Sequence, residues 1–241
     1  MALGGLAAVG CSDSPTRSEF DGNGRLTAQV TAPTSALGPG VHALGLGSPR
    51  DGVLFLPTSY DPATPITLVL MLHGAGGTGA AIGTAFEALA ESAGVAVIAP
   101  DSRYRTWDAV LDDFGPDVKF IDAALAATFA RVNVDPARLT IAGFSDGASY
   151  ALALGVSNGN LFRRIIAFSP GFLYARSTQG KPPIYLAHGT SDPILPIAST
   201  SRVIAPALES AGYTVDYHEF DGGHVIKQSL AEDALAWAAT P

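Results

Sequence analysis

Residues Gly143-Phe144-Ser145-Asp146-Gly147 decide the fold. Before them, residues 138–142 form a short, mostly apolar run that predicts a buried strand, and residues 148–154 are good helix formers. The pattern Gly-x-Ser-x-Gly between a strand and a helix predicts a sharp turn that presents its serine at the edge of a sheet. The turn is so tight that a Cβ at either glycine would collide with a neighbouring element. The sequence therefore predicts that Ser145 is a nucleophile in a strained backbone conformation.

The composition is that of a globular domain with a large core. The chain has 241 residues, of which 47% are hydrophobic and 15% are charged. Its net charge is −8 and it has no run of Lys or Arg, so a nucleic-acid or anionic-membrane partner is not expected. The single cysteine, Cys11, excludes an internal disulfide, and no Cys/His cluster has the spacing of a zinc site. We therefore expect no metal.

Residues 1–35 are expected to form a leader or tether, followed by a single domain over residues 36–241. The first ten residues are mostly small and apolar, and Ala8-Val9-Gly10-Cys11 resembles the lipobox of bacterial lipoproteins, in which the cysteine is lipidated. Two features depart from that pattern: no basic residues precede the apolar run, and Ala8 stands where leucine is usual. The run is too short to span a bilayer. The resemblance implies a bacterial protein outside the cytoplasm, secreted or anchored through Cys11, and an unmodified leader remains the alternative.

Apolar runs rich in β-branched residues alternate with helix-forming segments from residue 66 to the end. Continuous apolar runs predict strands that are buried on both faces of a parallel sheet. The predicted strands are 51–56, 66–72, 95–99, 138–142, 164–169, 183–188 and 213–220, with a further edge strand at 26–31. The predicted helices are 80–93, 118–131, the segment from 148, 199–211 and 226–239. This alternation predicts an α/β fold with a mostly parallel central sheet and helices on both faces.

Three polar residues follow predicted strands, at the sheet edge where working residues of such folds belong. Ser145 follows the strand over 138–142, Asp192 follows the strand that ends at His188, and His224 follows the last strand. Ser, Asp and His in this chain order match the α/β-hydrolase arrangement. In that arrangement the histidine removes the serine proton and the carboxylate holds the imidazole. Asp221 lies near His224 in sequence and remains an alternative acid.

From Leu56 onward the chain resembles the α/β-hydrolase superfamily and, within it, the phospholipase/carboxylesterase group. Polyhydroxybutyrate depolymerase-like and feruloyl esterase-like proteins are close neighbours of that group. The resemblance rests on four motifs: His73-Gly74-Ala75-Gly76-Gly77, Gly143-Phe144-Ser145-Asp146-Gly147-Ala148, His188-Gly189-Thr190-Ser191-Asp192 and Gly222-Gly223-His224. It implies a serine carboxylic-ester hydrolase that forms a covalent acyl-enzyme and needs no cofactor.

An ester hydrolase also needs hydrogen-bond donors for the oxyanion that forms during attack. The backbone N–H of Asp146 is expected to be one donor because it follows the nucleophile, and the resemblance implies the N–H of Ala75 as the other. Gly76 beside it would let the backbone approach the substrate without side-chain bulk. His73 is expected to orient this loop through hydrogen bonds.

The substrate is less well defined by the sequence. Trp107, Tyr104 and Phe172 are expected to contact the acyl group, although an aromatic residue in a long loop, such as Trp107 or Tyr104, is nearly as often a packing residue. The connection over 170–181 is short, which predicts an open cleft without a large cap domain. Short-acyl, phenolic or polyester-type esters, small or linked to a polymer, would suit such a cleft. A serine peptidase and a non-catalytic binding module of the same fold are the alternatives, and the oligomeric state is not predicted.

Overall fold

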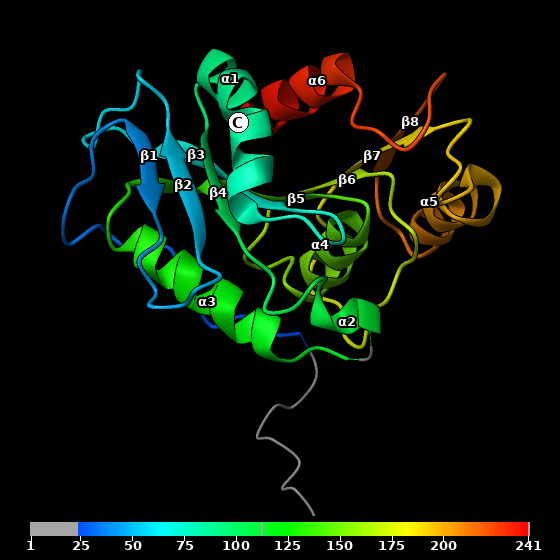
Figure 1. The fold of residues 1–241 in the computed structure, drawn as a ribbon, viewed down its shortest axis with the longest axis horizontal. Coiled ribbons are helices and arrows are strands. Elements are labelled where there is room, and N and C mark those ends of the chain that lie inside the picture. The colour runs from blue at the N-terminus through cyan, green and yellow to red at the C-terminus, as the bar shows by residue number, and fades with distance from the viewer. Residues whose placement is uncertain (1–23, 112, 241) are drawn as a thin grey trace, which may run out of the picture.

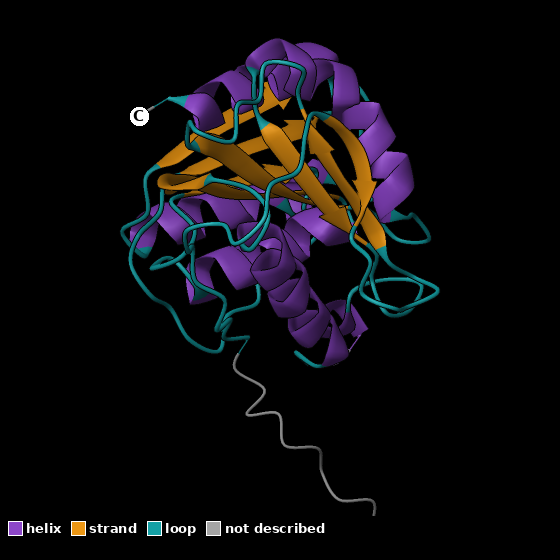
Figure 2. Cartoon of the chain, turned by 90° about the vertical axis from the view of Figure 1, so that its left-hand side faces the viewer, coloured by secondary structure: helices purple, strands orange, loops and turns teal. Residues whose placement is uncertain are grey.

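The computed structural model describes residues 24–111 and 113–240, and an eight-stranded sheet lies at its centre (Figure 1). The strand order is β1-β2-β4-β3-β5-β6-β7-β8. Strands β3 to β8 are parallel, and β1 and β2 are the antiparallel strands at one edge. Figure 2 shows the sheet twisting between two layers of helices. The predicted fold, an α/β-hydrolase fold with a mostly parallel sheet, is confirmed.

The strands and helices follow the predicted alternation closely. The strands are β1 (Gly40–Ala43), β2 (Gly52–Leu56), β3 (Ile66–Leu72), β4 (Ala96–Pro100), β5 (Val134–Phe144), β6 (Arg164–Phe168), β7 (Ile184–Gly189) and β8 (Val215–Phe220). The helices are α1 (Gly79–Ala93), α2 (Asp108–Leu111), α3 (Pro116–Phe129), α4 (Asp146–Ser157), the short 3-10 helix η1 (Ile197–Ser199), α5 (Ser201–Ser210) and α6 (Gln228–Ala239).

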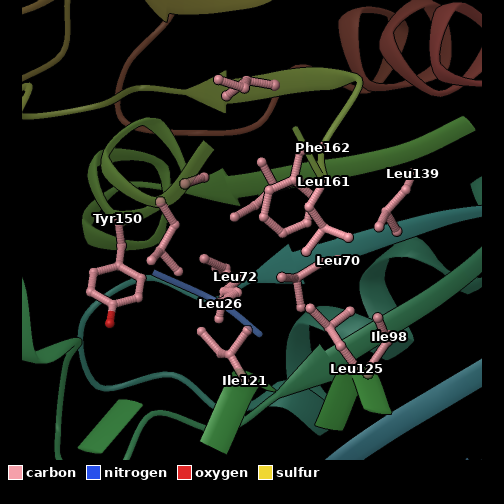
Figure 3. Packing of buried hydrophobic residues seen from close by; sticks show 14 of the residues in the cluster. Leu26, Leu70, Leu72, Ile98, Ile121, Leu125, Leu139, Tyr150, Leu161 and Phe162 are labelled. Atoms are coloured by element: carbon pink, nitrogen blue, oxygen red, sulfur yellow. The ribbon is translucent and has the colours of Figure 1, made fainter. Parts of the chain in front are cut away.

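Strand β3 shows why the central strands are apolar throughout. All seven of its residues are buried, and successive side chains enter two different cores. Leu70 and Leu72 belong to the core under α3 and α4, where Figure 3 shows them beside residues of the neighbouring strands and of α3. Val69 and Met71 belong to the core under α1 and α6. A strand with helices on both faces has no solvent-facing side, so period-two polarity is absent.

The helix after β3 begins and ends where its local chemistry predicts. The side chain of Thr78 accepts a hydrogen bond from the N–H of Ala81 at 3.1 Å and caps the start of α1. Gly94 ends the helix in the left-handed conformation, with φ 64°. The turn over 73–78 is therefore fixed at one end by β3 and at the other end by the start of α1.

Residues 24–35 do not form the expected tether. Leu26 and Ala28 are buried, and Leu26 lies in the core that also contains residues of α3 (Figure 3). The predicted edge strand at 26–31 is also absent, because its amides bond side chains instead of another strand. The N–H of Leu26 donates to Oδ1 of Asn158 at 2.9 Å, and the N–H groups of Thr27 and Ala28 donate to Asp122. The domain therefore includes residues from Gly24 onward, which corrects the boundary at 35.

Between β6 and β7 the chain runs along α4 without a helix or strand, and the N–H of Gly171 donates to Oγ of Ser149 and that of Gln179 to the carbonyl of Val156. This connection is where a cap would be inserted, so the structure has no large cap domain, as predicted. Among the residues that the structure describes, no helix is long and apolar enough to cross a bilayer. Cys11 and the lipobox-like residues lie outside the described residues, so lipidation of Cys11 and a location outside the cytoplasm stay predictions.

Candidate active site

The turn at Ser145 has the strained conformation that the sequence predicts. Ser145 joins β5 to α4 with φ 58° and ψ −123°, values that non-glycine residues rarely adopt. The flanking glycines leave no room for a side chain. A Cβ on Gly143 would lie 2.1 Å from the carbonyl oxygen of Gly147, and a Cβ on Gly147 would lie 2.3 Å from that of Leu72. The turn therefore packs backbone against backbone and holds Ser145 at the carboxyl end of β5.

Ser145, His224 and Asp192 form one hydrogen-bonded chain. Nε2 of His224 lies 2.9 Å from Oγ of Ser145, and Nδ1 of His224 lies 2.6 Å from Oδ2 of Asp192. A carboxylate can only accept, so Nδ1 carries the ring hydrogen and Nε2 is free to accept the serine proton. Asp221, the alternative acid, is an exposed residue, whereas the side chain of Asp192 is fully buried against the ring. The geometry therefore favours Asp192 as the partner of His224.

The carboxylate of Asp192 is held by more than His224. Its Oδ1 accepts hydrogen bonds from the N–H groups of Ile194 and Leu195, each at 2.8 Å. Burial by itself would raise the pKa of Asp192, but the Leu195 amide, the His224 ring and the Ile194 amide together outweigh burial and lower the pKa below its usual value. Asp192 is therefore ionised, as an acid that must stabilise an imidazolium should be.

The loop after β3 is braced by His73, as expected. Nδ1 of His73 donates to the carbonyl of Gly74 at 2.7 Å, and Nε2 accepts the N–H of Ser102 at 3.0 Å. Burial lowers the pKa of this ring, so it is neutral and each nitrogen has one defined role. The N–H of Gly76 donates to the carbonyl of Arg105 at 2.7 Å and ties the loop to the segment after β4.

The two predicted oxyanion donors lie on this loop and at the start of α4. Within residues 24–111 and 113–240, the N–H groups of Ala75 and Asp146 have no protein acceptor. Gly74 brings the loop close to the nucleophile, since a Cβ on Gly74 would lie 3.2 Å from Cβ of Ser145. Gly76 has φ 72°, a conformation that favours glycine in this turn. The geometry is compatible with the predicted oxyanion hole.

The side chain of Asp146 is bonded to the segment that follows β4. Its Oδ2 accepts a hydrogen bond from Oγ1 of Thr106 at 2.6 Å. The neighbouring Trp107 is fully buried, donates from Nε1 to the carbonyl of His73 at 2.8 Å and stacks on Tyr150 at 5.2 Å. Trp107 is therefore a packing residue, and its assignment to the acyl pocket was wrong. An indole buried against the core cannot contact a substrate.

The other two residues assigned to the substrate remain accessible. Tyr104 is 60% exposed, in the same segment as Trp107. Phe172 is half-buried, and its N–H donates to Oγ of Ser149 at 3.4 Å, which ties the connection after β6 to α4. Their roles in substrate binding stay predictions.

Sequence reasoning missed two residues that contact the catalytic groups. The ring centroids of Phe144 and His224 lie 4.8 Å apart, and Nε2 of His188 lies 3.2 Å from Oδ2 of Asp192. Both positions belong to recognised motifs, but a motif does not say which way a side chain turns. In the described part of the chain, no group of three or more His, Cys, Asp or Glu side chains could hold a metal ion.

The sheet order and the turn at Ser145 define this chain as an α/β-hydrolase. Solved structures with the same fold include a fluorophosphonate-binding serine hydrolase of Staphylococcus aureus, with a TM-score of 0.69, 15% identity and coverage of 85% of this chain and 100% of that chain. A ferulic acid esterase of Anaeromyces mucronatus has a TM-score of 0.65, 17% identity and coverage of 90% and 98%. At such identities the likeness shows the fold alone.

More specifically, the chain belongs to the phospholipase/carboxylesterase family, whose model matches residues 113–239. Feruloyl esterase C of Emericella nidulans is 30% identical over 223 aligned positions, and the match covers 77% of this chain and 82% of that protein. A probable feruloyl esterase C of Aspergillus clavatus is 30% identical over 184 aligned positions, and the match covers 71% of this chain and 66% of that protein. The protein is a serine esterase, and the resemblance found in the sequence is confirmed.

Proposed function

We propose that the protein hydrolyses carboxylic esters through a Ser145–His224–Asp192 triad and a covalent acyl-enzyme. The observation that carries this proposal is the unbroken hydrogen-bonded chain, 2.9 Å from Ser145 to His224 and 2.6 Å from His224 to Asp192. A serine hydroxyl attacks an ester only when a base takes its proton during attack, and Nε2 of His224 is positioned to do so.

Each step of the proposed reaction is assigned to a group of this chain. Oγ of Ser145 forms a bond to the ester carbonyl carbon as its proton moves to Nε2 of His224. The resulting oxyanion accepts hydrogen bonds from the N–H groups of Ala75 and Asp146, donors of a kind commonly worth about 3–4 kcal/mol each in the transition state. His224 then gives its proton to the leaving alcohol as the ester bond breaks. Water attacks the acyl-enzyme by the reverse route, releases the acid and restores Ser145.

Esters of phenolic acids are the substrate class that we favour, with short-acyl and polyester-type esters as the wider range. Two observations support this choice: the named relatives are feruloyl esterases, and the connection between β6 and β7 carries no cap. An uncovered site would admit an ester that is attached to a polymer. Tyr104 and Phe172 would then contact the acyl group at the mouth of the site.

Hydrolysis of p-nitrophenyl acetate, butyrate and octanoate and of methyl ferulate would test the proposal. The wild type and Ser59→Ala, a change at an exposed serine, should turn over the acetate and methyl ferulate, and Ser145→Ala should not. A fluorophosphonate probe should add its mass to the peptide that contains Ser145. Turnover that survives Ser145→Ala would refute the proposed nucleophile. Turnover of the octanoate alone would refute the substrate class.

A further inference from the structure

His188, at the end of β7, has a hydrogen-bond partner on each ring nitrogen although its side chain is fully buried. Nε2 lies 2.8 Å from the carbonyl oxygen of Leu195, and Nδ1 lies 2.7 Å from Oγ of Ser201. A carbonyl can only accept, so Nε2 carries the hydrogen and Nδ1 accepts the hydroxyl of Ser201. Burial lowers the pKa of His188, so the ring is neutral and this tautomer is the one that satisfies both partners.

The ring contacts Asp192 along two routes. Directly, Nε2 lies 3.2 Å from Oδ2 of Asp192, the same oxygen that accepts Nδ1 of His224 at 2.6 Å. Indirectly, His188 donates to the carbonyl of Leu195, and the N–H of the same residue, in the preceding peptide unit, donates to Oδ1 of Asp192 at 2.8 Å. Both oxygens of the carboxylate are therefore positioned with the help of one buried ring.

We propose that His188 is a positioning residue for the reaction, which orients Asp192 toward His224 in the tautomer that the carbonyl of Leu195 sets, with the hydroxyl of Ser201 donating to the other ring nitrogen. This inference rests on the proposed triad. A chain of side-chain contacts would then run from Ser201, the first residue of α5, to His188, across the 3.2 Å from its Nε2 to Asp192, and on through His224 to Ser145. The start of α5 would then stabilise the position of Asp192 through Ser201 and His188.

Packing alone does not explain this residue. A buried polar ring is costly unless its nitrogens are paired, so a site that needed only volume would be filled as well by leucine or phenylalanine. Here both ring nitrogens are used, and the contacts of Nε2 are with the turn over 192–195. Because the ring is buried and cannot touch a substrate, its loss should lower kcat and leave KM nearly unchanged.

Kinetics of His188→Leu and His188→Gln on p-nitrophenyl acetate would test the inference. We expect His188→Leu to lower kcat on the order of 10–100-fold, as loss of a group that orients a catalytic ligand does, with KM changed less than about twofold. Gln keeps an N–H for Leu195 and should restore most of kcat. Ser201→Ala should lower kcat less, and the exposed Ser199→Ala is its matched control.

A double-mutant cycle separates positioning from a general structural role. If His188 acts through Asp192, then His188→Leu should cost little further activity in the Asp192→Asn background. Equal losses in both backgrounds, a raised KM, or wild-type kcat in a folded His188→Leu variant would overturn the inference. Where His188→Leu does not fold, Ser201→Ala, which is expected to lower kcat, makes the same cycle. If Asp192→Asn alone keeps wild-type kcat, the proposed triad itself has failed, which is a separate result from an additive cycle.

Discussion

The first turn of α4 lies directly against the end of β3, at Gly147 and Leu72. An added Cβ on Gly147 would lie 2.3 Å from the carbonyl oxygen of Leu72 and 2.5 Å from that of His73. Both of these neighbours are backbone atoms, which cannot rotate away as a side chain can. The position of Ser145 relative to the loop over 73–78 therefore depends on the absence of a single side chain.

Gly147→Ala should lower both stability and activity. Overpacking a core usually costs about 1–3 kcal/mol, and a clash with backbone belongs at or above the upper end of that range. Thermal unfolding would measure the loss, with Gly38→Ala as the matched control because a Cβ on Gly38 meets nothing within 4 Å. Equal melting temperatures of the two variants would show that α4 can move away from β3.

Asp192→Asn and Asp221→Asn should separate the two carboxylates that the sequence offers as the acid. Asn at 192 can donate to Nδ1 of His224 and would favour the tautomer with hydrogen on Nε2, which cannot accept the serine proton. The expected loss in kcat is on the order of 10⁴-fold, the loss found when a triad acid is replaced in this way. The exposed Asp221 should change kcat less than about twofold. The reverse ranking would make Asp221 the acid.

Trp107→Phe should lower stability, whereas Tyr104→Ala should weaken substrate binding. Trp107→Phe removes the hydrogen bond to the buried carbonyl of His73, and an unsatisfied buried group costs about 1–3 kcal/mol of stability. Tyr104→Ala, at an exposed position, should change stability by less than about 0.5 kcal/mol and raise KM for methyl ferulate. Urea unfolding and steady-state kinetics would measure both. An unchanged KM in Tyr104→Ala would exclude Tyr104 from substrate binding.

The buried Asp117 should make stability fall as pH rises from about 4 to 6. Its Oδ1 accepts the N–H of Arg103 at 2.5 Å and its Oδ2 accepts the N–H of Asp108 at 2.7 Å. Burial first, and the charge of Asp108 as well, outweigh these bonds and raise the pKa of Asp117 to about 6. The folded chain therefore keeps its proton at pH values where the unfolded chain has lost it, which stabilises the fold only at low pH.

Unfolding free energies of the wild type and Asp117→Asn across this pH range would test the sign. The wild type should lose about 3 kcal/mol relative to the variant between pH 4 and 7, since each pKa unit corresponds to about 1.4 kcal/mol. Asp233→Asn, at an exposed position, is the control and should show no such trend. If the wild type instead gained stability relative to Asp117→Asn as the pH rises, Asp117 would be stabilised as the ion.

Local patterns were sufficient to predict strands β2 to β8 and the chain order of the proposed triad, but not the edge strand β1. A strand such as residues 66–72, which has almost no polar residues, has no face suited to solvent. Its composition therefore predicts a position inside a parallel sheet, covered on both faces. The sequence predicted that Ser145, Asp192 and His224 lie close together, because the carboxyl ends of parallel strands meet at one edge of the sheet. The glycines around Ser145 likewise reflect a turn whose geometry is local.

Contacts between distant segments were decided only by tertiary structure. Leu26 was assigned to a tether because its polar partner, Asn158, lies far along the chain. Trp107 was assigned to the substrate because nothing in its segment shows that the carbonyl of His73 would bind its indole. The contact between His188 and Asp192 was likewise not visible in the sequence, because the motif that contains both residues does not show how their side chains turn. A sequence pattern states what a side chain can bond, and folding of the whole chain selects which of those bonds form.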